Sequence, residues 1–433
     1  MRLDIVNASV VNGDGQSLSE QTSLIIEDGF ITDVPSVAYI PYNAYADRVI
    51  DAQGALVIPG LINIHAHGIT FGPFFPYAWK KLSETRTLNN LNTHLLQGTT
   101  TLLNNDGLAL PAEVEAANKL HPINIRTCTL HTPLNLKAAD VSAGDGIEQK
   151  HREFDAVEAV RLGAVALGEV GSPGTTYAAY EKGLSIGKLV PVPQARLLDL
   201  AVLSGNKQTV RDVLRQTGLE ELGLEGAEEL VRRTSIEPLE ACRAAILDSV
   251  RQCQKLGIPV LAHAEPTTKD AILQTAHGLG SQLIAVHVNH NFEVDEALEV
   301  ARKLKQHGAR VEVITADAFG ARQLDRTPEV TFALLREGLV DAISTDFSGG
   351  YHDPILLVLQ RAIEAEVLSL PAAVRLATSA PAALIPGLAP NRGLLKPGAV
   401  ADVCIVDRDD VSRVRYVLIS GRVVVEEGQL VGS

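Results

Sequence analysis

Residues 57–68 read Val-Ile-Pro-Gly-Leu-Ile-Asn-Ile-His-Ala-His-Gly, an apolar run that ends in a His-x-His pair. Side chains at positions i and i+2 of a strand point to the same side, so His65 and His67 can hold one metal ion together. Two histidines in a surface loop are the alternative interpretation. The apolar run before the pair and Gly68 after it favour metal binding.

The chain beyond this stretch alternates short apolar runs with helical patterns, which predicts an α/β fold. Eight candidate strands separated by helices match the number that a (β/α)8 TIM barrel requires. Near-continuous apolar strands are typical of parallel sheets that are buried on both faces. The predicted strands are Leu61–Ile64, Thr99–Asn104, Ile123–Leu130, Ala164–Glu169, Pro259–His263, Leu283–His287, Arg310–Ile314 and Asp341–Ser344, and predicted helices include Glu148–Leu162, Asp295–His307 and Pro354–Leu368.

Both ends of the chain have a different sequence pattern, which predicts short strands joined by Gly-containing turns. We expect residues 1–57 and 391–433 to form one small β-sandwich domain, and residues 58–390 to form the barrel. A long segment, residues 171–235, interrupts the barrel after its fourth strand. It is either a lid over the catalytic mouth or a peripheral helical addition, such as an oligomer contact.

Further polar side chains end other predicted strands. Glu169 ends the fourth strand, where a carboxylate is costly unless it is paired or bound to metal. His263 and His287 end the fifth and sixth strands, and Asp346 follows the eighth. A salt bridge, a hydrogen-bonded core histidine and a turn aspartate are the respective alternatives. Since barrel strands gather their carboxyl ends at one face, the set favours a shared metal site.

Bulk properties narrow the class of protein. The 433 residues carry a net charge of −14, which argues against binding to nucleic acid. The four cysteines form no CxxC pair, as is typical of reduced thiols in a cytoplasmic protein. We see no signal-peptide pattern and no apolar run that could span a bilayer. We expect a homo-oligomer with a small-molecule substrate and no membrane partner.

Together these residues resemble the amidohydrolase superfamily. The resemblance rests on residues 57–68, Glu169, His263, His287, the Ser-Thr-Asp run ending at Asp346 and the closing stretch 377–407. It covers nearly the whole chain apart from residues 171–235. The resemblance implies that His65, His67 and Asp346 hold one divalent metal ion and that His263 and His287 hold a second.

The resemblance also implies how the two ions are joined. Many family members use a carboxylated lysine on strand four, whereas this chain has Glu169 there, as in the branch that resembles enamidase and related cyclic-amide hydrolases. Two ions would share a hydroxide that attacks a carbonyl carbon, with Asp346 carrying its proton to the leaving nitrogen. Zinc suits this set of ligands, with iron or manganese as alternatives.

Two other functions stay open at this point. Many deaminases of the superfamily, such as those that resemble cytosine deaminase, carry a catalytic Glu three residues after the strand-five His, whereas Glu265 lies only two residues after His263. This spacing weakens, without removing, the alternative of a deaminase that acts on an aminoheterocycle with one metal ion. A barrel that holds metal without catalysis is the third interpretation. His131 is a candidate for substrate binding, and Asp106 is a weaker one.

Overall fold

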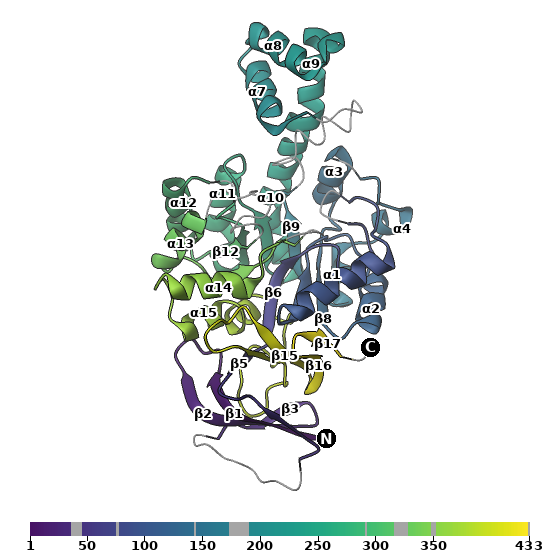
Figure 1. The fold of residues 1–433 in the computed structure, drawn as a ribbon. Coiled ribbons are helices and arrows are strands. Elements are labelled where there is room, and N and C mark those ends of the chain that lie inside the picture. The colour runs from purple at the N-terminus through teal and green to yellow at the C-terminus, as the bar shows by residue number, and fades with distance from the viewer. Residues whose placement is uncertain are drawn as a thin grey trace.

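The protein is described by a computed structural model that covers residues 1–35, 46–74, 78–142, 144–172, 190–290, 292–315, 328–347 and 352–431. Two sheets organise these residues: an eight-stranded parallel sheet from the middle of the chain and a nine-stranded mixed sheet from its two ends. Figure 1 shows the mixed sheet below the parallel one, with the first strand of the barrel rising out of it.

The parallel sheet is the predicted (β/α)8 barrel. Its strands pair in chain order from β6 to β13, and a parallel bridge between Ala66 and Phe347 brings the last strand back to the first. Each observed strand lies within two residues of its prediction at either end, because near-continuous apolar runs mark buried parallel strands. The strands are β6 (Leu61–Ala66), β7 (Thr99–Asn104), β8 (Asn124–Thr129), β9 (Ala164–Val170), β10 (Val260–His263), β11 (Leu283–Val286), β12 (Arg310–Ile314) and β13 (Ala342–Ser344).

Helices alternate with these strands along the chain and pack outside them (Figure 1). The predicted helix Glu148–Leu162 is instead two helices, because the Asp155 side chain accepts a hydrogen bond from the Glu158 N–H and begins a new helix there. The barrel helices are α1 (Glu84–Leu96), α2 (Pro111–Leu120), α3 (Pro133–Ser142), α4 (Gln149–Arg152), α5 (Ala156–Arg161), α10 (Glu237–Leu256), α11 (Lys269–Leu279), α12 (Val294–Gln306), α13 (Pro328–Arg336), α14 (Ile355–Glu364), α15 (Leu370–Leu376) and α16 (Ser379–Leu384).

The mixed sheet joins both ends of the chain, as expected. Strand β5 pairs in parallel with β1 and antiparallel with β14, so one strand links the N-terminal and C-terminal halves. The apolar side chains of the mixed sheet, among them Ile5, Leu24 and Leu418, form a cluster separate from that of the barrel. The strands are β1 (Arg2–Val11), β2 (Leu18–Glu27), β3 (Phe30–Asp33), β4 (Arg48–Asp51), β5 (Leu56–Pro59), β14 (Val403–Val406), β15 (Val414–Ile419), β16 (Arg422–Glu426) and β17 (Gln429–Leu430).

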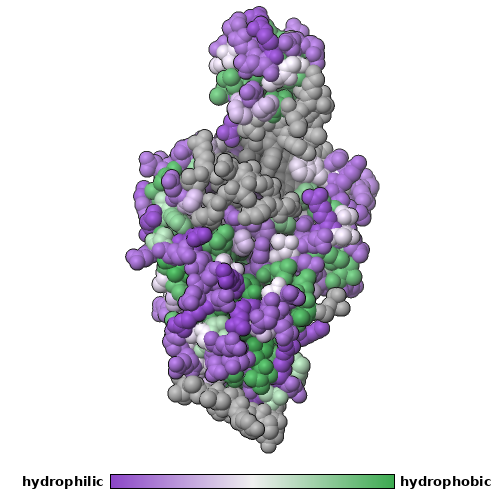
Figure 2. Space-filling model, viewed as in Figure 1, coloured by the Kyte–Doolittle hydropathy of each residue, from purple (hydrophilic) through white to green (hydrophobic). Residues whose placement is uncertain are grey.

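The described part of the insertion is a helical unit with its own apolar core. It contains α7 (Val192–Leu203), α8 (Lys207–Thr217) and α9 (Gly223–Val231), which pack around Leu198, Val213 and Leu230 before the chain enters α10. Figure 1 shows the unit projecting from the side of the barrel at which β6 ends, and Figure 2 shows mostly hydrophilic residues on its visible face. Residues 173–189 lie outside the described part of the chain.

None of the described helices combines the length and the apolar character that a bilayer-spanning segment needs. Barrel enzymes place their catalytic groups at the end of the barrel at which the parallel strands finish.

Candidate metal centre

The six predicted ligands converge at the carboxyl end of the barrel strands. They come from five strands that are far apart in sequence, and all but Asp346 have almost fully buried side chains. Asp346 retains 22% of its side-chain surface. Their positions are β6 for His65, directly after β6 for His67, β9 for Glu169, the last residue of β10 for His263, directly after β11 for His287 and just beyond β13 for Asp346.

The first group consists of His65, His67 and Asp346. Their candidate ligand atoms all lie within 4.8 Å of one another. Oδ1 of Asp346 lies 3.5 Å from Nε2 of His65 and 3.3 Å from Nε2 of His67. Ligand atoms about 2.1 Å from a tetrahedral zinc ion are separated by about 3.4 Å, so this spacing fits one ion between the three side chains.

Glu169 lies between the first group and the other two histidines. Its Oε2 is 3.5 Å from Nε2 of His65 and 3.7 Å from Nε2 of His67. Its Oε1 is 2.8 Å from Nδ1 of His263 and 2.7 Å from Nε2 of His287, which are hydrogen-bond distances. One carboxylate oxygen therefore faces each pair of histidines.

Two of these residues have unusual backbone conformations. His287 has a φ of 42° and Asp346 a φ of 50°, both in the left-handed region that side chains other than glycine seldom adopt. Hydrogen bonds hold both positions: the His287 N–H donates to Oε2 of Glu312, and the Asp346 N–H donates to the carbonyl oxygen of His65. Such conformations collect at functional sites, where they aim side chains that regular strands could not.

Three further carboxylates face three of the four remaining ring nitrogens, and Nδ1 of His287 has no hydrogen-bond partner among the described residues. Nδ1 of His67 lies 3.0 Å from Oδ1 of Asp106, and Nδ1 of His65 lies 3.3 Å from Oε1 of Glu312. Nε2 of His263 lies 3.8 Å from Oε2 of Glu265. A carboxylate on one ring nitrogen leaves the other nitrogen with its lone pair directed at a metal ion. Asp106 thus contacts a candidate ligand. Glu312 was not among the residues expected from the sequence.

Charge is balanced within the cluster by histidines. Burial alone would raise the pKa of Glu169, but the charges of His65 and His287 and hydrogen bonds from His263 and His287 hold it well below its usual range. Burial would likewise raise the pKa of Asp346, but the charge of His65 and a hydrogen bond from His67 lower it to about 2.

The pKa values of the histidines shift in opposite directions. Burial opposes the charged form of His65, yet Asp346 and Glu169 raise its pKa well above the ordinary value. Burial and the charge of His263 lower the pKa of His287. Among the described residues, the ion-pair partners of Glu169 and Asp346 are all histidines. Divalent cations can replace the protons that hold these groups together.

His131, the predicted substrate-binding residue, follows β8 and is buried. Its Nδ1 lies 3.1 Å from the Thr129 hydroxyl, and its ring packs edge-on against Phe154 at 5.1 Å. Burial lowers its pKa to about 4, so the imidazole is neutral near pH 7. Within the described part of the chain no contact joins it to the six candidate ligands, and its role in substrate binding stays a prediction.

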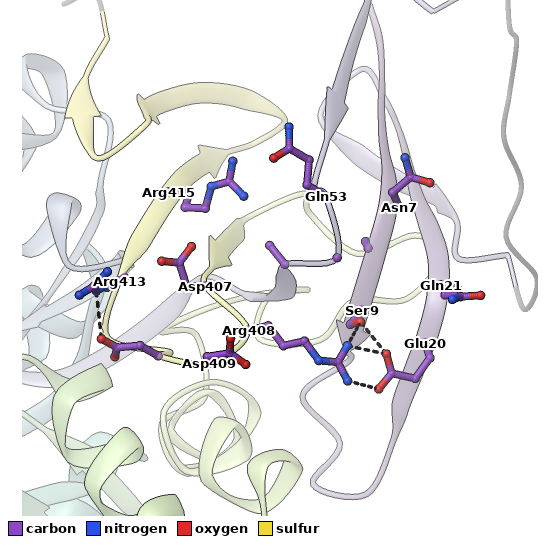
Figure 3. Close-up of a pocket in the computed structure, with 14 residues that line it drawn as sticks. Asn7, Ser9, Glu20, Gln21, Gln53, Asp407, Arg408, Asp409, Arg413 and Arg415 are labelled. Atoms are coloured by element: carbon purple, nitrogen blue, oxygen red, sulfur yellow. Dashed lines mark hydrogen bonds and ion pairs between the residues drawn. The ribbon is translucent and has the colours of Figure 1, made fainter.

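A hollow of about 1020 Å³ lies elsewhere, beside the terminal sheet. Figure 3 shows Arg408 there, bonded to Glu20 at 2.7 Å and to Ser9 at 2.6 Å. Arg413 pairs with Asp410 at 3.1 Å. Arg408 and Arg413 thus each have an acidic partner, and none of the candidate ligands lines the hollow.

Comparison with known proteins agrees with this placement. The profile of the amidohydrolase family matches residues 56–424, a span that contains every candidate ligand. Residues of this chain are 29% identical over 167 positions to a 5-methylthioadenosine/S-adenosylhomocysteine deaminase of Acetivibrio thermocellus, covering 34% of this chain and 37% of the relative. The chain spans between 14% and 37% of the length of the curated relatives it matches.

Solved structures share the fold over the full chain. A β-aspartyl dipeptidase of Fervidobacterium islandicum AW-1 superposes with a TM-score of 0.61 at 14% identity, covering 100% of this chain and 98% of its own. An enamidase gives 0.56 at 19% identity, with 99% and 97% covered. A D-hydantoinase gives 0.55 at 17% identity, with 100% and 97% covered. At these identities the likeness concerns the fold.

Proposed function

Because the chain belongs to the amidohydrolase family, we propose that it is a metal-dependent hydrolase that cleaves the C–N bond of a cyclic amide at a centre of two divalent metal ions. One observation carries the proposal: Oε2 of Glu169 faces His65 and His67, while Oε1 faces His263 and His287. A carboxylate whose two oxygens face different pairs of histidines can bridge two ions without a modified lysine.

The donors fit such ions. His65, His67 and Asp346 would hold one ion, His263 and His287 the other, and Glu169 both. Nε2 of His65 is buried and forms no hydrogen bond within the described residues, so its lone pair is available to a metal. When bound, the ions supply a water that is nucleophilic at neutral pH and polarise the scissile carbonyl. Imidazole and carboxylate ligands suit zinc, with iron or manganese as alternatives.

Asp346 is the residue that we assign to proton transfer. It is the most exposed of the six, so a substrate at the mouth of the barrel can reach its carboxylate. The low pKa keeps its carboxylate ionised near neutral pH, and only the ionised form can accept a proton from the attacking water. It would then deliver that proton to the leaving nitrogen, since an amine leaves more readily than its anion.

Barrel depth supports the exclusion of bulk water. Asn63, Thr345 and Asn289 are buried around the cluster, and their side chains bond to backbone or side-chain partners within the barrel. Five of the six candidate ligands are likewise buried, and charges removed from bulk water act on one another more strongly. Enamidase and D-hydantoinase, with which the chain shares its fold, support the choice of a cyclic amide.

A deaminase that releases ammonia from an aminoheterocycle is the second candidate. It is supported by the similarity to methylthioadenosine/S-adenosylhomocysteine deaminases and by Glu265, which is buried next to His263. Against it stand the two-residue spacing between His263 and Glu265 and the divided contacts of Glu169.

Product analysis separates the two functions. The metal-reconstituted protein would be incubated with hydantoins, dihydropyrimidines and lactams on one side and with aminopurines and aminopyrimidines on the other. We expect ring-opened products from the first set, detected by mass spectrometry, and no ammonia from the second. Ammonia from the second set alone would overturn the cyclic-amide proposal, and a metal-loaded protein inert to both would favour a barrel without catalysis.

A further inference from the structure

Strand β12 supplies none of the six candidate ligands, yet it places a carboxylate directly beside them. Glu312 lies in the middle of this strand, between Val311 and Val313, and its side chain is fully buried. A carboxylate in a dry interior costs folding free energy unless charged or hydrogen-bonding partners compensate it. Its partners therefore show what the residue does.

Those partners come from three other strands of the barrel. Oε1 of Glu312 lies 3.3 Å from Nδ1 of His65 and also accepts a hydrogen bond from the Ser344 hydroxyl. Oε2 accepts the backbone N–H of His287 at 2.6 Å. One carboxylate thus joins a candidate ligand of the first ion to the backbone of a candidate ligand of the second.

The contact with His65 is an ion-pair distance and not a hydrogen bond, and it favours one tautomer of that ring. An imidazole whose Nδ1 faces a carboxylate keeps its proton on that nitrogen, which leaves the Nε2 lone pair for a metal ion. Nε2 of His65 lies 3.5 Å from both Asp346 and Glu169, at the place where an ion would sit.

The contact with His287 acts on the main chain. His287 has a left-handed φ of 42°, and its N–H is fixed by the Glu312 carboxylate. Loss of that bond would release a conformation that side chains other than glycine seldom adopt. The Nε2 of His287 would then no longer be held at Oε1 of Glu169.

We propose that Glu312 is a positioning residue of the metal centre, which fixes the tautomer of His65 and the backbone of His287 and so prepares both halves of the site for metal. The proposal rests on the proposed function, because it presumes that these histidines bind metal. It assigns β12 a part in the site through two candidate ligands on other strands, His65 of β6 and His287 directly after β11.

Glu312→Gln is the direct test, since it keeps the size of the side chain and removes the charge. Asp4→Asn is the matched control: Asp4 is equally buried and pairs with Arg2 at 2.9 Å, but it lies in the terminal sheet. Metal-free proteins would be titrated with Co²⁺ and Zn²⁺ against a competing chelator. Ions per chain, the Co²⁺ absorption spectrum and thermal unfolding of the metal-free protein would be recorded.

We expect Glu312→Gln to weaken metal binding about 10- to 100-fold and to change the Co²⁺ spectrum. Asp4→Asn should lower thermal stability and leave affinity and spectrum unchanged. Wild-type affinity and spectrum in Glu312→Gln would overturn the proposal. If that variant fails to fold, Ser344→Ala takes its place, with a smaller loss of affinity expected and unchanged binding as the contrary result. Fewer than two ions in the wild type would instead refute the proposed two-metal centre.

Discussion

Oε1 of Glu169 lies 2.7 Å from Nε2 of His287, 118 positions further along the chain. The contact exists because β9 and β11 flank β10 and end at the same face of the barrel. It is shorter than the 3.5 Å between Oε2 of Glu169 and Nε2 of His65. The half of the site around His65 is thus spaced for an ion, whereas the half around His287 is closed by hydrogen bonds.

This difference predicts an order of metal binding. The first ion should occupy the group of His65, His67 and Asp346, and the second should bind more weakly because it must displace the hydrogen bonds between Glu169 and His263 or His287. Calorimetric titration of the metal-free protein should resolve two steps. His263→Asn should abolish only the weaker step, and loss of the tighter step instead would contradict the assignment.

Substitution of Asp346 separates catalysis from metal binding. Asp346→Asn keeps an oxygen that can face the ion but cannot accept a proton. We expect both ions to remain and kcat to fall about 10²- to 10⁴-fold, as is usual when a proton-transfer group is lost. Elemental analysis and steady-state kinetics measure the two effects. Retained turnover would refute the role of Asp346 in proton transfer.

Acid should destabilise the fold through His121. Its Nδ1 accepts the Ile123 N–H at 3.3 Å, its Nε2 lies 3.1 Å from Asn92, and burial lowers its pKa from 6.5 to about 4. The unfolded chain binds the proton more readily, so the stabilisation is present above pH 6.5 and is lost as the pH falls toward 4.

The non-titrating variant His121→Gln isolates this contribution. Between pH 7 and pH 4.5 the wild type should lose about 2–3 kcal/mol of unfolding free energy more than the variant does. Urea unfolding at both pH values gives the comparison. Equal losses in the two proteins would show that His121 is not the source of the acid sensitivity.

Substitution in the apolar core of the helical unit should destabilise that unit without affecting the metal centre. Leu198 is buried in its apolar cluster, whereas Leu200 on the same helix is 64% exposed. Leu198→Ala should cost about 2–5 kcal/mol within the unit and speed hydrogen exchange in α7–α9, while Leu200→Ala should change little. Metal content should match the wild type in both, and loss of metal from Leu198→Ala would contradict the independence of the two parts.

The sequence predicts the barrel well because its signals are local. Most barrel strands are short apolar runs, and each candidate ligand ends or follows such a run, so the topology of a barrel is sufficient to bring them together. The helix predicted over Glu148–Leu162 is wrong in one respect, since the capping side chain of Asp155 divides it.

Glu312 was missed for a different reason. Its contacts come from three other strands, two from side chains and one from a backbone N–H, and no spacing in the sequence records them. The available signal was a carboxylate between two valines in a strand expected to be buried on both sides, where an unpaired charge is costly. The contacts of the two Glu169 oxygens likewise could not be predicted from the sequence. The sequence shows a carboxylate at a strand end but not which histidines each oxygen faces.

Metal counting by native mass spectrometry can show whether Glu169 bridges two metal ions. Wild-type protein reconstituted with Zn²⁺ should carry two ions per chain, and Glu169→Gln, which keeps the shape but loses the charge of the side chain, should carry no more than one. One ion in the wild type, or two in Glu169→Gln, would rule out a bridge by Glu169.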